Sequence, residues 1–537
     1  MQSTEEDRKT DMGNVKRVRF EDEADGKRSP IQDSTELSEI APNRRSTLHV
    51  EVILHPACPI PTSTLRLEIE KFVYNVGTLS FMYEIGPLNL TGAPSLLQQT
   101  CKLISINEWE SPLHLSQSNT TTQNSSSTLH HDSTILEERM HLHDVLIEKT
   151  PSIASWNISN ILIHIFTLSE EEAELEDIDT GGNGDDSENL TACETLPLPH
   201  SSLHTLWDNI ILPGNIKRNL LAYAQTALLF SEKQVSPHII TWNRVLLLHG
   251  PAGTGKTSLC RSLAHKLSIR LSNRFPSGGF LMEIHSHSLF SKWFSESGKL
   301  VHTLFQHIRQ MIENEPDGLF CLLVDEVESL ATSRIGSSSS GSSEPSDAIR
   351  AVNALLTSLD QLKRYQNVII LTTTNITGSV DVAFVDRADM KQYIGLPCLA
   401  ARYQILKGCI LELIRVGLIL PPRQQKSNSD VHGDTQSSDT SLLLHASIHQ
   451  EKKDEHFDDH AKTNKESSNL LYQAALLSDG FSGRCLRRIP FQTHAFHVNS
   501  SHPVNVEAFL EALCVAIQNE KSSVIHMVAV NKHMTQK

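Results

Sequence analysis

The sequence predicts an α/β fold, in which a doubly wound parallel sheet is preceded by a small α+β domain and followed by helices. Three continuous apolar runs, at 244–249, 319–324 and 368–374, have the length and composition of buried parallel strands. Helical periodicity at 296–315 and 346–364 places helices between them, as the crossover connections of parallel strands require. A chain of 537 residues is too long for one hydrophobic core, so we expect several domains.

A glycine-rich stretch follows the first apolar strand and precedes a helix expected at 258–267. It matches the pattern G-x-x-x-x-G-K-T, with the residues Gly250, Pro251, Ala252, Gly253, Thr254, Gly255, Lys256 and Thr257. In this pattern backbone N–H groups surround a nucleotide phosphate, the lysine reaches the β- and γ-phosphate oxygens, and the threonine hydroxyl holds Mg²⁺. The helix beginning at Ser258 adds the positive end of its dipole. We predict that this phosphate loop binds ATP with Mg²⁺; a turn that binds nothing is the alternative.

Polar side chains end the other two predicted strands. Asp325 and Glu326 follow the second strand, and Asn375 follows the third. Because phosphoryl transfer depends on positioning and charge stabilisation, an ATPase needs several such parts. We predict that Asp325 and Thr257 hold the Mg²⁺ shell, that Glu326 polarises the attacking water, and that Asn375 senses the γ-phosphate. Simple turn chemistry is the alternative for each residue taken alone.

Two arginines complete the predicted catalytic set. Arg387 follows Asn375 shortly before an apolar segment, where its guanidinium can protrude towards the γ-phosphate of a neighbouring subunit as an arginine finger. Arg484 starts a later helix and is expected to contact the γ-phosphate within its own subunit. A surface ion pair is the alternative for both side chains.

Composition divides the chain into four parts. Residues 1–45 are predicted to be a disordered tail, and residues 46–198 a small α+β domain whose stretch 169–189, with ten acids and no base, is an acidic linker. Residues 199–396 form the large ATPase subdomain. Residues 397–537 form a helical lid with a disordered insertion at 423–468. The elements expected inside these parts are a half-buried strand at 48–54, strands at 103–109 and 161–168, and helices at 65–76, 216–230, 400–418, 470–477 and 506–519.

Bulk composition excludes several classes. The net charge of −16 disfavours a non-specific nucleic-acid surface. Nine cysteines without CxxC spacing indicate a reducing compartment, with neither a disulfide scaffold nor a zinc site. No apolar run reaches the ~18 residues of a membrane span, and the start of the chain has no signal-peptide pattern, so we expect a soluble intracellular protein.

A short motif in the tail suggests a partner. Arg17-Val18-Arg19-Phe20 resembles the RVxF docking peptide of protein phosphatase one. A solvated basic stretch or a weak nuclear-import signal is an equal alternative.

The order of these motifs resembles the AAA+ ATPases, and within them the pachytene checkpoint protein 2 family. The segments that carry the closer resemblance are 240–250, 286–299, 344–350, 381–389 and 480–484. Recognition is strong over 203–420 and 470–520 and weak over 46–200. Ala252 stands where most relatives have proline, and the amino-terminal loop and lid insertion are longer than usual.

The resemblance implies a homohexameric ring whose amino-terminal domain captures HORMA-domain proteins, often presented by an adaptor. ATP hydrolysis would open their closed form by pulling a terminal segment through the pore, in spindle-checkpoint inactivation and in control of meiotic chromosome axes and recombination. It also implies a pore loop at Lys292, Trp293 and Phe294, with Arg387 as the trans finger and Arg484 as the lid sensor. The expected location is the nucleus and chromosomes, with the cytoplasm left open.

Three other interpretations were weighed against this one. A remodeller of other protein complexes differs only in its client. A DNA-directed AAA+ machine is disfavoured by the acidic balance and by the aromatic pair Trp293-Phe294, whose polar neighbours favour an exposed loop over a core position. A nucleotide-gated scaffold without turnover is disfavoured by the presence of Glu326 and Arg387.

Overall fold

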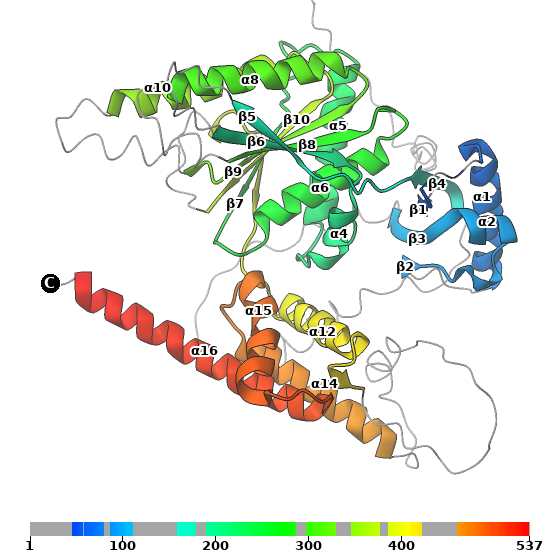
Figure 1. Ribbon diagram of the computed structural model, residues 1–537, viewed down its shortest axis with the longest axis vertical. Coiled ribbons are helices and arrows are strands. Elements are labelled where there is room, and N and C mark those ends of the chain that lie inside the picture. The colour runs from blue at the N-terminus through cyan, green and yellow to red at the C-terminus, as the bar shows by residue number, and fades with distance from the viewer. Residues whose placement is uncertain are drawn as a thin grey trace, which may run out of the picture.

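The structure is a computed structural model with three parts, an amino-terminal domain, the large ATPase subdomain and the lid (Figure 1). The predicted tail with Arg17–Phe20 and the predicted pore loop at 292–294 lie outside the described residues. No helix in the described part is long and apolar enough to cross a membrane. The structure describes residues 46–56, 58, 60–79, 86–110, 158–178, 190–285, 297–328, 345–375, 385–421 and 459–535.

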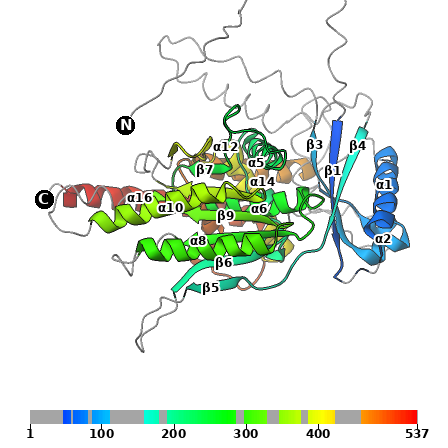
Figure 2. The ribbon, with the colours of Figure 1, turned by 90° about the horizontal axis from the view of Figure 1, so that it is seen from above.

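The amino-terminal domain is a four-stranded sheet with helices on one face. The strand order is β2-β3-β1-β4, with β1 antiparallel to β3 and parallel to β4. The helices α1 and α2 cover the face that points away from the ATPase subdomain (Figure 2). Four elements lie close to the predicted ranges: β1 (Ser46–Leu54), α1 (Thr62–Leu79), β3 (Cys101–Glu110) and β4 (Ile158–Phe166). Three others were not predicted: β2 (Gly86–Pro87), a 3-10 turn (Leu90–Gly92) and α2 (Ser95–Thr100).

Strand β1 is buried on both faces, which differs from the predicted half-buried strand. Leu48, Val50 and Val52 pack beneath α1 and α2, as their alternation predicts. On the opposite face, His49 and Glu51 are only 8% and 2% exposed. The reason is a second domain: this face of the sheet lies against helix α6 of the ATPase subdomain.

The large ATPase subdomain is built on a seven-stranded sheet in the order β11-β7-β10-β9-β8-β6-β5. Strands β11, β7, β10, β9 and β8 are parallel, so the α/β class is confirmed. Helices α5 and α6 cover one face, and α8 and α10 cover the other (Figure 1). The bounds are α4 (Leu206–Asn209), α5 (Ile216–Glu232), β7 (Val245–His249), α6 (Lys256–Arg270), β8 (Gly279–His285), α8 (Ser297–Asn314), β9 (Leu319–Asp325), α10 (Pro345–Leu362), β10 (Val368–Thr374) and β11 (Met390–Tyr393).

Two strands before residue 199 belong to this sheet, which corrects the predicted boundary. β6 (Leu190–Leu198) pairs antiparallel with β8, and β5 (Glu174–Ile178) pairs with β6. The stretch 169–189 is therefore not simply an acidic linker. β5 is the edge strand of the sheet, and its first residues Glu174 and Leu175 are exposed, a position that tolerates acidic residues.

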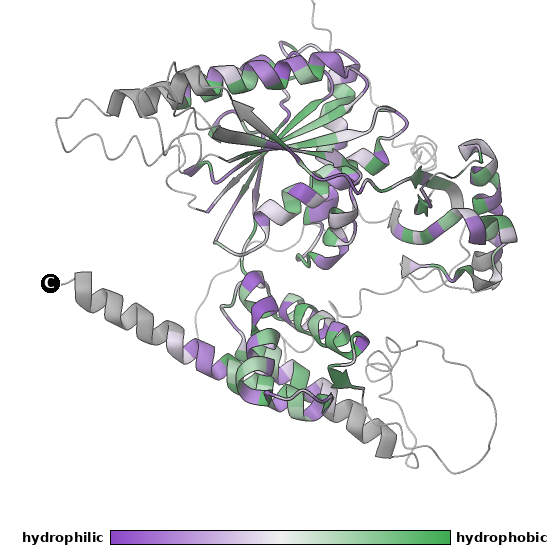
Figure 3. Ribbon diagram, in the orientation of Figure 1, coloured by the Kyte–Doolittle hydropathy of each residue, from purple (hydrophilic) through white to green (hydrophobic). Residues whose placement is uncertain are grey.

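Continuous apolar strands are explained by the two faces that they bury. In β7, Val245 and Leu247 join the core beneath α8 and α10, whereas Leu246 and Leu248 join the core beneath α5 and α6. Figure 3 shows hydrophobic colour along the central strands and alternating colour along α8, whose outer face meets solvent. A sheet covered on both sides favours near-continuous apolar runs in its strands.

Helix α6, which covers the helix predicted at 258–267, is buried around most of its circumference. Its apolar residues pack on the sheet. Its polar residues His265, Lys266 and Arg270 are 1%, 3% and 7% exposed, because the amino-terminal domain and α4 cover that side.

The lid is a helical subdomain joined to the large subdomain after Pro397. Cys398 precedes its first helix and is exposed. Helix α14 begins at Asp459, so residues 459–468 of the predicted disordered insertion are helical; within them, Ser467 is buried and donates to Glu507 at 2.8 Å. Residues 422–458 lie outside the described part. The elements are α12 (Leu399–Arg415), β12 (Ile419–Leu420), α14 (Asp459–Leu477), α15 (Gly483–Thr493), a π-helical turn (His494–Val498), β13 (Val504–Asn505) and α16 (Val506–Thr535).

Candidate active site

The phosphate loop connects β7 to α6 at the carboxyl edge of the parallel strands. Two glycines are required by its shape. Gly250 has φ +142°, and a Cβ there would overlap the carbonyl oxygen of Ile394. Gly253 has φ +76°, and a Cβ there would lie 2.8 Å from Ser482 Oγ in the lid. The loop is therefore held between the last strand of the sheet and the lid.

Lys256 lies at the start of α6, 5% exposed, with its ammonium group turned back into the loop. Its Nζ donates to the carbonyl oxygens of Gly250 and Pro251 at 2.9 and 2.8 Å, and to Asn375 Oδ1 at 2.7 Å. Burial lowers the pKa of Lys256, and the nearby carboxylates Glu328, Asp325 and Glu326 partly offset this effect. The ammonium group is thus surrounded by oxygen atoms, the environment that phosphate oxygens also provide.

Thr257 and Asp325 come together as predicted for Mg²⁺ ligands. Thr257 Oγ1 donates to Asp325 Oδ1 at 2.9 Å, and Thr373 Oγ1 donates to the same oxygen. A threonine hydroxyl and one carboxylate fit a cation that takes its remaining ligands from water and phosphate. In the described part of the chain, no group of three or more His, Cys, Asp or Glu side chains is placed to hold a metal ion.

Glu326 follows β9 in an unusual backbone conformation, with φ +55°. Non-glycine residues avoid this region, and such strain is concentrated at functional sites. The backbone N–H of Glu326 donates to Thr373 Oγ1 at 3.2 Å, which helps to hold the turn. Its exposed carboxylate lies 3.4 Å from Asn375 Nδ2, so Glu326 and Asn375 meet at the mouth of the site.

The sequence did not single out two residues of this site. Thr373, fully inside the sheet, contacts both Asp325 and the backbone of Glu326. Glu328, 9% exposed, accepts the backbone N–H of Asn375 at 3.0 Å. Their only signals were a hydroxyl inside an apolar strand and a third acid after Asp325 and Glu326. Neither pattern is specific enough without the fold.

A cavity of about 520 Å³ lies between the phosphate loop, the strand ends and the lid. Residues 252–258, Asp325, Glu326 and Asn375 line one side, and Arg484 lines the lid side. The backbone N–H of Arg484 donates to the carbonyl oxygen of Gly253 at 3.0 Å. The segment 209–213 and Ile405 supply an apolar wall that fits a nucleotide base, and the sequence did not indicate this wall.

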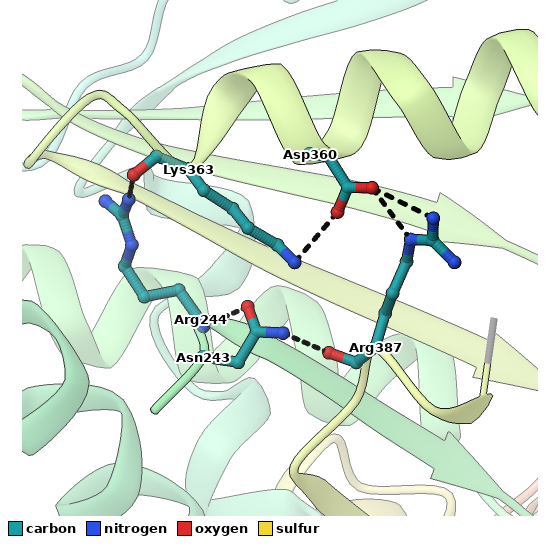
Figure 4. A network of polar contacts seen from close by, with 5 residues as sticks. All are labelled: Asn243, Arg244, Asp360, Lys363 and Arg387. Carbon is teal, nitrogen blue, oxygen red and sulfur yellow. Dashed lines mark hydrogen bonds and ion pairs between the residues drawn. The ribbon is translucent and has the colours of Figure 1, made fainter. Parts of the chain in front are cut away.

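Arg387 lies outside the wall of this cavity. Its Nε and Nη2 donate to Asp360 Oδ2 on α10 at 3.0 and 2.9 Å, and Lys363 Nζ lies 2.8 Å from the other oxygen of Asp360 (Figure 4). Burial alone would raise the pKa of Asp360, but the hydrogen bonds from Arg387 and Lys363 lower it. Asn243 donates to the carbonyl oxygen of Arg387 and fixes the backbone. Within one subunit, Arg387 therefore forms an ion pair with Asp360, which is the alternative that the sequence analysis gave to an arginine finger.

Comparison with known proteins gives matches to both subdomains. Residues 246–396 match the family model described as "ATPase family associated with various cellular activities (AAA)". Residues 398–521 match "TRIP13-like, AAA+ ATPase lid C-terminal domain". The pachytene checkpoint protein 2 homolog of Rattus norvegicus is 44% identical over 374 residues, which cover 69% of this chain and 78% of that protein.

The chain belongs to the pachytene checkpoint protein 2 family. The homolog of Oryza sativa subsp. indica is 46% identical over 368 residues, covering 68% of this chain and 72% of that protein. A solved structure of C. elegans PCH-2 has a TM-score of 0.59 and 29% identity, covering 89% of this chain and 99% of that one. Membership confirms the AAA+ fold with its carboxyl-terminal lid, and it identifies an ATP-hydrolysing enzyme that binds nucleotide.

Proposed function

We propose that this protein is a homohexameric, Mg²⁺-dependent AAA+ ATPase that converts HORMA-domain proteins from their closed to their open form. We place this activity in the nucleus and on chromosomes, in spindle-checkpoint inactivation and meiotic chromosome control. Membership of the pachytene checkpoint protein 2 family supports HORMA-domain proteins as the clients. One observation supports the assembly of subunits into a ring. The phosphate loop and its carboxylates line one cavity within a subunit, whereas Arg387 lies outside that cavity and pairs with Asp360.

The residues of one subunit divide the work of hydrolysis. Lys256 and the loop N–H groups bind phosphate oxygens, and Thr257 with Asp325 would hold Mg²⁺, which neutralises charge on the transferred group. Glu326 polarises the attacking water. Asn375, whose backbone N–H is held by Glu328, fixes the orientation of the Glu326 carboxylate. Arg484 contributes from the lid, so nucleotide binding draws the lid onto the loop.

The second step of the proposal concerns the neighbouring subunit. Arg387, as a trans finger, must exchange its ion pair with Asp360 for the γ-phosphate across the subunit boundary. The predicted pore loop at Lys292, Trp293 and Phe294 would grip the client, since flat side chains provide contact area at modest entropic cost. Phosphatase docking through Arg17–Phe20 remains a separate prediction from the tail.

ATP hydrolysis measured with a HORMA protein, with DNA and with neither tests the proposal. We expect stimulation by the HORMA protein, or by the HORMA protein with its adaptor, together with conversion of the closed form to the open form. Stimulation by DNA alone would favour the DNA-directed class. Replacing Trp293 and Phe294 with alanine should abolish conversion and leave basal hydrolysis intact; a soluble double variant that still remodels at the wild-type rate contradicts the pore-loop assignment.

A further inference from the structure

The face of the amino-terminal sheet that points away from α1 and α2 packs against α6, and the residues at this junction are buried. Side chains alternate along β1, so His49, Glu51 and Ile53 point towards the ATPase subdomain. Glu51, Lys266 and Arg270 are 2%, 3% and 7% exposed, and all three meet at this junction. Charged side chains are almost never buried this deeply unless they are paired.

One carboxylate holds the charged part of the junction together. Lys266 Nζ lies 2.5 Å from Glu51 Oε1, and Arg270 Nε lies 3.6 Å from the same oxygen. Asn107 Nδ2 donates to Glu51 Oε2 at 2.6 Å, and Ser105 Oγ donates to Asn107 Oδ1 at 2.6 Å. Glu51 thus receives two cations from the ATPase subdomain and one amide from its own sheet.

The apolar part of the junction is small by comparison. Ile53 and Phe166 from the amino-terminal domain pack against Ile269 of α6. Apolar contacts are non-directional, so a cluster of this size does little by itself to fix the orientation of the amino-terminal domain on α6. Buried ion pairs often add little net stability, but they can specify one arrangement over others. The charged cluster gives the face between β1 and α6 its directional contacts.

The position of this cluster connects it to the nucleotide. Helix α6 runs from Lys256 to Arg270, 15 residues. At a rise of about 1.5 Å per residue, its two ends are about 22 Å apart. Its first turn belongs to the phosphate loop, and its last turns carry Lys266 and Arg270. One rigid helix therefore touches the nucleotide at one end and the amino-terminal domain at the other.

We propose that Glu51 locks the amino-terminal domain in a single orientation on the phosphate-loop helix, so that this domain and the large subdomain turn as one body while the lid moves. The assignment concerns the folded chain and does not require a HORMA client. The consequence that a captured client is carried along with each turn of the large subdomain rests on the proposed function.

Pairs of spin labels measure directly whether the amino-terminal domain holds one orientation on the large subdomain. Labels at Leu67→Cys on α1 and Lys233→Cys after α5, both exposed positions, would be placed in a Cys398→Ser background and diluted into unlabelled subunits. We expect the distances between the two labels to form one narrow distribution. Glu51→Lys should broaden the distribution, and Glu51→Lys with Lys266→Glu should narrow it again. Glu68→Lys, which breaks only the surface pair with Lys71, is the matched control and should leave the distance narrow.

A second pair of labels separates locking from general rigidity. With ATP bound to the Glu326→Gln variant, the distance from Lys233→Cys to Phe496→Cys in the lid should shift, whereas the Leu67–Lys233 distance should not. A nucleotide-dependent shift of both distances would overturn the proposal, as would a narrow Leu67–Lys233 distance in Glu51→Lys. Glu51→Gln, which keeps the side-chain shape, covers the case in which Glu51→Lys does not fold; it should broaden the same distance.

Activity distinguishes failure of the lock from failure of the proposed function. Unlocked Glu51 variants should bind ATP and hydrolyse it near the wild-type basal rate, because Glu51 does not touch the cavity. They should lose conversion of the closed HORMA protein. If the wild-type ring converts no HORMA protein, the proposed function fails, and the spin-label distances still decide the lock.

Discussion

The large ATPase subdomain meets its two neighbours in opposite ways. Its junction with the amino-terminal domain is occupied by side chains, where Glu51 forms ion pairs with Lys266 and Arg270 and accepts a hydrogen bond from Asn107. Its junction with the lid encloses a cavity of about 520 Å³. The first junction is complete in the chain itself, whereas the second has room for a ligand. A ligand shifts a domain arrangement through the contacts that differ between its two states, and the lid lines the nucleotide cavity directly, so we expect the lid to be the domain that responds to nucleotide.

The comparison predicts that damage at the lid junction removes turnover. Lys256→Ala should abolish nucleotide binding, because the loop loses the ammonium group that meets the phosphates. Glu326→Gln should bind ATP and stall, since an amide cannot activate water. ATP retention after gel filtration separates the two variants. Equal loss of ATP from both would show that binding and hydrolysis do not divide between Lys256 and Glu326.

The proposed junction between neighbouring subunits should give an effect nearly as large. Arg387→Ala should bind ATP and lose turnover by ~10³–10⁵, the range for an arginine finger. Mixing it with inactive Lys256→Ala should restore some hydrolysis, because mixed rings place an intact finger against an intact loop. No recovery in rings shown by pull-down to be mixed would assign Arg387 a role in its own subunit. Asp360→Asn, which removes the carboxylate that pairs with Arg387 and Lys363 but keeps Arg387 itself, is the matched control and should retain most turnover.

At the junction between the amino-terminal domain and α6, we expect the free energy of unfolding to depend on pH. His164 of β4 lies opposite Glu51 and stacks on His49, and it is 7% exposed. Burial, with Lys266 and Arg66, lowers its pKa from 6.5 to about 4. Between pH 6.5 and 4 the unfolded chain binds a proton that the folded chain refuses, so the free energy of unfolding falls as pH falls. From pH 7 to 5 this loss is about 2 kcal/mol.

Urea unfolding of the wild type and His164→Gln at both pH values tests this prediction. The variant should lose less stability on acidification, and replacement of the exposed His238 by glutamine should change nothing. The raised pKa of Glu51, caused by its burial, acts in the opposite direction and is present in all three proteins, so it cancels in the comparison. Identical pH dependence in wild type and His164→Gln would contradict a neutral buried His164.

The smallest effect concerns the contact between loop and lid. Gly253→Ala places a methyl group against Ser482, whereas Gly255→Ala has a similar positive φ and nothing within 4 Å. Both variants should pay roughly 1–2 kcal/mol of backbone strain. Only Gly253→Ala should loosen the lid in nucleotide-free protein, with exchange of the Arg484 and Cys485 amide hydrogens about tenfold faster. Equal exchange in the two variants would mean that the lid does not rest on Gly253.

The parts that were predictable are those specified by local pattern. The phosphate loop follows from eight consecutive residues, and the parallel strands follow from apolar runs that reflect burial on two faces. The unpredicted parts depend on distant partners. The second buried face of β1 depends on α6, more than 200 residues away, and β5 was hidden because an edge strand tolerates the acidic residues of a linker. Thr373 and Glu328 became site residues only when neighbouring strands brought them beside Asp325 and Asn375.

Cys398, at the start of the lid, has a practical consequence. All nine cysteines are free, and Cys398 is the exposed one among them. Burial raises the pKa of the Cys409, Cys485 and Cys514 thiols elsewhere in the lid, so they react more slowly with alkylating reagents. A maleimide dye added to the native protein should therefore attach first beside Pro397, at the pivot of the lid. The chain thus carries its own fluorescent reporter position for lid rotation, and no engineered cysteine is needed to follow each ATP cycle in real time.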